Sequence, residues 1–129
     1  MIKILILDDD AGTCNHLAKF FRSRGYTVLT AIRGEDALSV IEKEKPQILF
    51  LDIKMEGISG LDVLKKAKES NPNVKAVMIT AIDDEAIKRQ AEEIGVVKYI
   101  TKPFSFDMLE TLIIRLVNDV LKLEGTKKT

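Results

Sequence analysis

Carboxylates, a hydroxyl and an ammonium group follow short apolar segments at four separate places in the sequence. They belong to Asp8, Asp9, Asp10, Asp52, Thr80 and Lys102. If the apolar segments are parallel strands of one open sheet, these side chains meet at its carboxyl edge, where such sheets bind ligands. Clustered carboxylates repel one another, and Mg²⁺, which prefers carboxylates, waters and phosphate oxygens, would relieve the repulsion.

This set of groups suits phosphoryl transfer onto a carboxylate. An aspartate can act as a nucleophile and form an acyl phosphate. The transfer depends mainly on positioning and on neutralising the phosphoryl oxygens, so Mg²⁺ and Lys102 would supply charge and Thr80 a hydroxyl donor. Each residue alone has an ordinary explanation, because an aspartate after a strand often caps a helix and Lys102 could be a surface lysine. The combination at four strand ends indicates a site.

Five short apolar segments would have to position these residues. They are rich in Val, Ile and Leu and span residues 2–7, 26–31, 48–51, 74–79 and 96–100. Nearly continuous apolar strands are typical of a parallel sheet that is covered on both faces. We therefore predict that helices lie on both faces of the sheet.

Helical periodicity fills the intervals between these segments. The first helix is indicated by Cys14, Leu17, Ala18 and Phe21, and the last by Leu109, Leu112, Ile113, Leu116 and Val120. The acidic residues 83–85 suit the start of a helix, and Gly25 and Gly95 suit helix ends. Five βα units in this order predict an α/β fold with right-handed crossovers.

Length and composition narrow the class of protein. A chain of 129 residues predicts one domain, here assigned to residues 1–124 with a short, frayed polar tail at 125–129. Twenty basic residues balance 20 acidic ones, which gives no general attraction to nucleic acid or membranes. One cysteine, no signal peptide and no membrane-spanning segment favour a cytoplasmic protein.

Four motifs together resemble the response-regulator receiver family over essentially the whole chain. They read ILILDDD, LFLDIKMEGISGLDVL, AVMITA and YITKPF. The resemblance implies a doubly wound, flavodoxin-like sheet of order 2-1-3-4-5 with five helices. It also implies a two-component signalling switch, not a conventional enzyme, which takes a phosphoryl group from the phosphohistidine of a sensor histidine kinase or a phosphotransfer protein.

The resemblance assigns roles to the acidic residues. Asp52 would be the phosphoacceptor, and Asp8 and Asp9 would form the acidic pair of the metal site. Asp9 and Asp52 would bind Mg²⁺ directly, together with the backbone carbonyl of Lys54. These ligands leave room for water and phosphoryl oxygens around the ion, as Mg²⁺ requires.

The resemblance also assigns roles around the phosphoryl group. Thr80 and Lys102 would contact it, and Tyr99 would be the aromatic residue that follows phosphorylation. The Lys102–Pro103 peptide bond would be cis, which an X-Pro bond permits at modest cost. Glu56 departs from the family, which usually has proline there, so a φ constraint is lost from the loop after Asp52.

Two other classes of protein use a similar sheet. A phosphatase of the haloacid dehalogenase type needs a D-x-D-x-T pattern on the first strand. Here Asp8 and Asp10 fit, but the threonine falls one place late, at Thr13. A flavodoxin-type module would have to hold a flavin phosphate in a first loop that carries three repelling aspartates. Both are therefore weaker hypotheses than the receiver.

Two further expectations concern output and lifetime. Ile114 and Leu121 extend the apolar stripe of the last helix beyond one buried face. They predict a partner surface for a homodimer or an effector on the fourth helix, fifth strand and fifth helix, unless the stripe packs under the tail. Lys54 and Ile82 should flank the path of the water that attacks the phosphoryl group, and neither carries an acid or amide that could orient it. This predicts slow self-dephosphorylation. The chain is either a stand-alone relay protein or the receiver part of a longer regulator.

Overall fold

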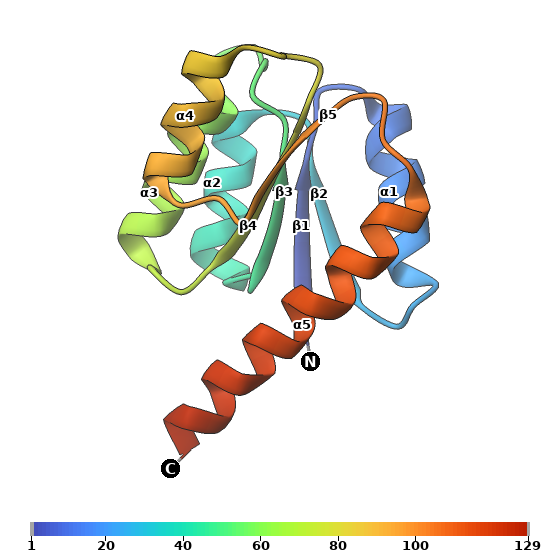
Figure 1. The fold of residues 1–129 in the computed structure, drawn as a ribbon, viewed down its shortest axis with the longest axis vertical. Helices are drawn as coiled ribbons and strands as arrows, with labels where there is room; N and C mark the ends of the chain where they lie inside the picture. Colours follow the sequence, from blue (N-terminus) through green and yellow to red (C-terminus); the bar gives the residue numbers. More distant parts are fainter. Residues whose placement is uncertain (1, 129) are drawn as a thin grey trace.

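Strands and helices alternate along the chain in the computed structural model, which describes residues 2–128 (Figure 1). The strands are β1 (Lys3–Leu7), β2 (Thr27–Ala31), β3 (Ile48–Leu51), β4 (Lys75–Thr80) and β5 (Lys98–Thr101). The helices are α1 (Ala11–Arg22), α2 (Gly34–Glu44), α3 (Gly60–Ser70), α4 (Glu85–Ile94) and α5 (Phe106–Lys128). The predicted βα order is confirmed.

The strands form one parallel sheet of order β2-β1-β3-β4-β5, as the resemblance implied. The order reverses between β1 and β3, which creates the topological switch point of the sheet. Leu7 pairs with Leu51, so the residues that follow β1 and β3 leave the sheet at the same level. The register therefore brings Asp8 and Asp52 together at the carboxyl edge.

Two apolar layers cover the sheet, one on each face. Figure 1 shows α1 and α5 on one face and α2, α3 and α4 on the other. Successive strand residues enter opposite layers, so Ile4 and Ile6 pack with α1 and α5, whereas Leu5 and Leu7 pack with the other helices. Burial on both faces explains why the strands read as unbroken apolar runs.

Local signals set the ends of α4, and they agree with the sequence analysis. The Asp84 side chain caps the helix by accepting hydrogen bonds from the N–H groups of Ala86 at 2.9 Å and Ile87 at 3.1 Å. Gly95 ends the helix with a φ of 119°, a left-handed conformation that glycine adopts without strain.

The structure differs from the prediction at the end of α5. The predicted polar tail at 125–129 is helical through Lys128, and Thr129 lies outside the described residues. The last turns project past the sheet (Figure 1), and the Gln47 side chain donates a hydrogen bond to Glu124 at 3.4 Å. The boundary placed at 124 therefore falls inside a helix, and the fraying expected from residue 125 stays a prediction. None of the helices in the described residues is long and apolar enough to cross a membrane.

Candidate functional site

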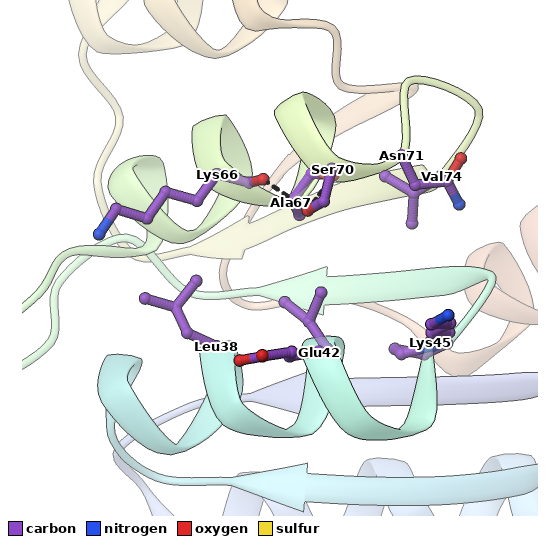
Figure 2. Close-up of a pocket in the computed structure, with 10 residues that line it drawn as sticks. Leu38, Glu42, Lys45, Lys66, Ala67, Ser70, Asn71 and Val74 are labelled. Atoms are coloured by element: carbon purple, nitrogen blue, oxygen red, sulfur yellow. Dashed lines mark hydrogen bonds between the residues drawn. The ribbon is translucent and has the colours of Figure 1, made fainter.

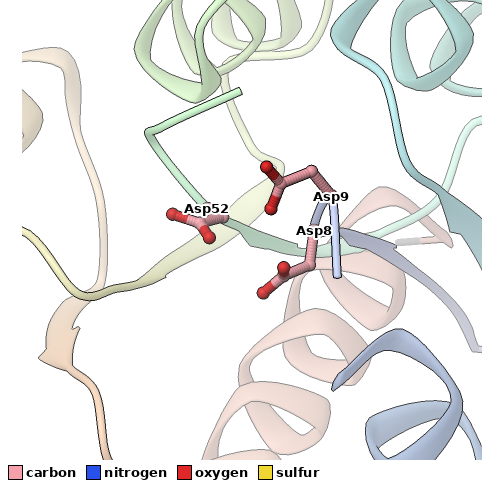
Figure 3. Close-up of side chains that lie close together, drawn as sticks. All are labelled: Asp8, Asp9 and Asp52. Atoms are coloured by element: carbon pink, nitrogen blue, oxygen red, sulfur yellow. The ribbon is translucent and has the colours of Figure 1, made fainter. Parts of the chain in front are cut away.

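Three aspartates converge at the carboxyl edge of the sheet (Figure 3). Carboxylate oxygens of Asp8, Asp9 and Asp52 all lie within 4.8 Å of one another. Asp8 is 3% exposed and Asp52 is 6% exposed, whereas Asp9 faces solvent. Backbone bonds extend the strand ladder to both buried residues, because Asp8 N–H donates to Ala31 at 3.2 Å and Asp52 N–H donates to Leu7 at 2.9 Å. The sheet itself therefore fixes where these two carboxylates lie.

Lys102 is the counterion of the two buried carboxylates. Its Nζ lies 2.6 Å from Oδ2 of Asp8 and 3.1 Å from Oδ2 of Asp52. Its backbone N–H donates to the Thr80 carbonyl at 2.7 Å, which ties the start of the β5–α5 loop to the end of β4. The Lys102–Pro103 peptide bond is cis, as expected.

Burial and neighbouring charge have opposite effects on the pKa of Asp8 and on the pKa of Lys102. Burial raises the pKa of Asp8 because it disfavours the charged form, and Lys102 offsets part of that shift. Burial alone would lower the pKa of Lys102, but its contacts with Asp8 and Asp52 outweigh that effect and raise it. Lys102 is therefore held in its charged form, and the excess negative charge of the cluster remains available to a cation.

The donor set of the cluster fits Mg²⁺. All three side chains offer hard oxygen ligands, and exposed Asp9 keeps one side open to water and to a phosphate. Asp10 does not join the cluster. Its side chain caps α1 by accepting from the N–H of Gly12 at 2.9 Å and from the hydroxyl of Thr13 at 3.2 Å. A dehalogenase-type site would need Asp8 and Asp10 together, so this geometry argues against it.

The loop between β3 and α3 is held against the end of β3 at both of its ends. Lys54 N–H donates to Oδ1 of Asp52 at 3.3 Å, and Gly60 N–H donates to the Ile53 carbonyl at 3.0 Å. Gly60 also lies so close to the Asp52 carbonyl that a Cβ at this position would overlap the oxygen. Only glycine fits there, so the backbone of the loop packs directly against the end of β3.

Thr80 and Tyr99 meet on the backbone of Ile82. The fully buried Thr80 hydroxyl accepts a hydrogen bond from Ile82 N–H at 3.3 Å. The Tyr99 hydroxyl donates to the Ile82 carbonyl at 2.6 Å. Roles for Thr80 and Tyr99 near the site were expected from the sequence, but their shared partner was not, because it depends on the path of the β4–α4 loop.

An aromatic hollow of about 450 Å³ adjoins Lys102. It is lined by Thr13, His16, Lys102, Pro103, Phe104 and Phe106. Phe106 is 42% exposed, and its ring centroid lies 4.9 Å from that of Phe20 on α1. This surface was not predicted from the sequence, although Phe104 and Phe106, which follow the Lys-Pro pair, were a signal for it.

A larger groove of about 710 Å³ lies between α2 and α3 and contains none of these site residues (Figure 2). Lys45 and Pro46 precede β3 and Val74 precedes β4, so the groove opens at the amino edge of the sheet. It is thus separated from the acidic cluster by the length of the strands. The site predicted at the carboxyl edge and this groove do not coincide.

Comparison with known proteins agrees with this geometry. The model of the response regulator receiver domain family matches residues 4–114. Sporulation initiation phosphotransferase F of Bacillus subtilis (strain 168) is 32% identical over 111 residues, covering 86% of this chain and 90% of that protein. The solved CheY-like receiver domain protein of Methanospirillum hungatei JF-1 superimposes with a TM-score of 0.88 at 28% identity, covering 95% of this chain and 98% of that one.

Longer regulators also match, but only in part. The alkaline phosphatase synthesis transcriptional regulatory protein PhoP of Bacillus subtilis (strain 168) is 37% identical over 103 residues. That alignment covers 80% of this chain and 43% of the regulator. The chain thus spans nearly all of one relative and less than half of the other. With its fold, acidic cluster and family match taken together, the chain belongs to the response regulator receiver domain family of two-component systems.

Proposed function

We propose that the chain accepts a phosphoryl group on Asp52 in a reaction that requires Mg²⁺. The observation that carries this proposal is the surroundings of the Asp52 carboxylate, which is buried beside Asp8 and Asp9 and held 3.1 Å from the Lys102 ammonium. A nucleophile in this setting is oriented by its neighbours and faces charges that can neutralise an incoming phosphoryl group.

The residues of the site would have different roles in phosphoryl transfer. Asp8, Asp9 and Asp52, with the Lys54 carbonyl, would hold Mg²⁺, which when bound neutralises phosphoryl oxygens. An Asp52 oxygen forms the new bond to phosphorus as the bond to the donor nitrogen breaks. Lys102 is poised to turn from Asp52 to a phosphoryl oxygen.

Thr80 would be the hydroxyl donor to the phosphoryl group. In the structure its oxygen accepts a hydrogen bond from Ile82, so its own proton is free to be donated elsewhere. Donation to a phosphoryl oxygen would draw Thr80 toward Asp52 and disturb its bond to Ile82. Because Tyr99 holds the other side of the same residue, the change would reach β5.

The phosphodonor would be a sensor histidine kinase or a phosphotransfer protein. A phosphohistidine must be brought to the open rim of the acidic cluster, so the donor has to cover residues beside Lys102. The aromatic hollow there offers apolar contact area next to the reacting atoms. The first of the relatives described above is itself named a phosphotransferase, which supports a donor protein of this kind.

The output would use a surface of α4, β5 and α5, by pairing with a second copy or by binding an effector. Ile114 is 55% exposed and Leu121 is 51% exposed, one above the other on α5. We expect beryllofluoride with Mg²⁺ to change amide hydrogen exchange across this surface, because Thr80 and Tyr99 share a partner in the β4–α4 loop. Changes confined to the loop after Asp52 would contradict the proposal.

Asp9→Ala should raise the Mg²⁺ concentration for half-maximal phosphorylation about tenfold, since it removes an exposed carboxylate ligand while leaving Asp52 in place. The measurement is the rate of labelling by acetyl phosphate over a range of Mg²⁺ concentrations. Asp10→Ala is the matched control. It removes the cap of α1, which costs about 1 kcal/mol of stability, but leaves the cluster intact. An equal Mg²⁺ shift in both variants would refute the ligand assignment.

A further inference from the structure

The first turn of α2 is pressed against the loop between β3 and α3. Oε1 of Glu35 accepts a hydrogen bond from Ile58 N–H at 3.3 Å. At Gly34 a Cβ would lie 2.5 Å from the Ile58 carbonyl oxygen, and at Gly57 it would lie 2.6 Å from Oε1 of Glu35. Gly57 also has a φ of 83°, so the chain turns here in a way that glycine favours. Two glycines thus allow the close approach that the hydrogen bond requires.

The surroundings of the Glu35 carboxylate stabilise its negative charge. It is the second residue of α2, where free backbone N–H groups stabilise negative charge. Its other oxygen lies 3.6 Å from Nε of Arg33. Its pKa is lowered by hydrogen bonds from its own N–H and from Ile58, so the carboxylate is charged when it accepts from the loop.

The same loop carries the backbone next to the acidic cluster. Lys54 N–H bonds to the Asp52 carboxylate, and the far end of the loop returns to Asp52 through Gly60. Glu56 stands where a proline would restrict φ, so the backbone between these anchors has no such restriction. The bond from Glu35 restrains the loop at Ile58, between these two anchors and close to the start of α3.

We propose that Glu35 is a positioning residue for the metal site: it holds the β3–α3 loop so that the Lys54 carbonyl is presented to Mg²⁺ beside Asp52. This inference rests on the proposed function of the cluster. A loop that is already ordered loses less conformational entropy when the ion binds, so the restraint strengthens binding without Glu35 touching the ion. Glu35 thereby restrains the loop backbone, which a proline at position 56 would also do.

The test compares Glu35→Ala with Glu35→Gln and with Asp36→Ala. Glutamine retains an oxygen that can accept from Ile58, and Asp36 is a second exposed acid in the first turn of α2, so its loss reproduces the change in helix charge. Amide hydrogen exchange at Ile58, in protein stripped of metal with EDTA, measures the restraint itself. Calorimetric titration with Mg²⁺ measures the consequence.

Glu35→Ala should speed exchange at Ile58 and weaken Mg²⁺ binding about threefold to tenfold, which is the effect of one ordinary hydrogen bond. Glu35→Gln should stay within about twofold of the parent, as should Asp36→Ala. The inference is overturned if Glu35→Ala binds Mg²⁺ like the parent, or if Asp36→Ala weakens binding equally. If the parent itself fails to bind Mg²⁺, the proposed function of the cluster fails, and the exchange data still report whether Glu35 restrains the loop.

Discussion

Asp52→Asn should abolish phosphorylation by acetyl phosphate in the presence of Mg²⁺. The amide has nearly the shape of the carboxylate but lacks the anionic oxygen that forms the acyl phosphate. No nearby carboxylate should replace Asp52 as the nucleophile, because Asp8 is paired with the Lys102 ammonium at 2.6 Å and Asp9 faces solvent. The measurement is mass spectrometry of the labelled protein, with hydroxylamine treatment to identify an acyl phosphate.

Loss of labelling in this variant should not result from unfolding. The charge of Asp52 contributes to the raised pKa of Asp8, which means that the two carboxylates repel each other in the fold. Asparagine removes that repulsion and leaves the Lys102–Asp8 pair, so thermal stability should be close to that of the parent. Asp119→Asn, on α5, is the control and should be labelled normally. Hydroxylamine-labile phosphate retained in Asp52→Asn would refute the assignment of the phosphoacceptor.

The phosphorylated parent should lose its phosphoryl group slowly, and Ile82→Glu combined with Lys54→Asn should accelerate the loss about ten- to a hundredfold. Hydrolysis requires a water in line with phosphorus, and residues 54 and 82 are expected to flank its approach. A positioned acid or amide can orient that water. An optimally placed acid–base group commonly contributes a hundredfold or more, so newly introduced side chains should supply up to about a hundredfold. The parent has neither group at these positions.

Two hydrogen bonds fix the backbone of residue 82 in the β4–α4 loop. Its N–H is bonded to Thr80 and its carbonyl to Tyr99, so the backbone is held on both sides. The Ile82 side chain is half-buried and packs against the apolar layer of α2, α3 and α4, whereas Lys54 is exposed. A glutamate at residue 82 should therefore have a defined location.

The measurement of this lifetime is a decay time course after the phosphodonor is removed, in excess Mg²⁺. Ile82→Val combined with Lys54→Arg is the control, because it keeps the apolar and cationic character of the two positions. Decay of the control should match that of the parent. A parent that decays faster than the Ile82→Glu, Lys54→Asn variant would show that these residues do not shield the phosphoryl group.

Much of this fold is determined by local sequence. Unbroken apolar runs place β1 and β3 at the centre of a covered sheet, and period-3.6 stripes place the helices between the strands. Asp84 and Gly95 mark the ends of α4 in advance, because capping depends on a few adjacent residues. Since parallel strands share one carboxyl edge, Asp8, Asp52 and Thr80 could be assigned to a single site from their places after β1, after β3 and at the end of β4.

The tertiary structure decided how neighbouring aspartates divide their tasks. Asp8, Asp9 and Asp10 are consecutive, yet the first two join the acidic cluster and the third caps α1. The direction of each side chain depends on how the backbone turns from β1 into the helix. The extent of α5 was also decided there, since Gln47 contacts Glu124 across 77 residues and the helix continues to Lys128.

The individual hydrogen bonds between distant segments were likewise beyond the reach of sequence patterns. Lys102 lies 94 residues from Asp8 and Glu35 lies 23 from Ile58, yet hydrogen bonds join each pair. The aromatic hollow beside Lys102 forms because Thr13 and His16 of α1 lie beside Phe104 and Phe106. Periodicity tells which residues share one face of a helix or strand. The distances between side chains on different elements arise only when the layers pack, because packing sets the spacing and rotation of each element against the sheet.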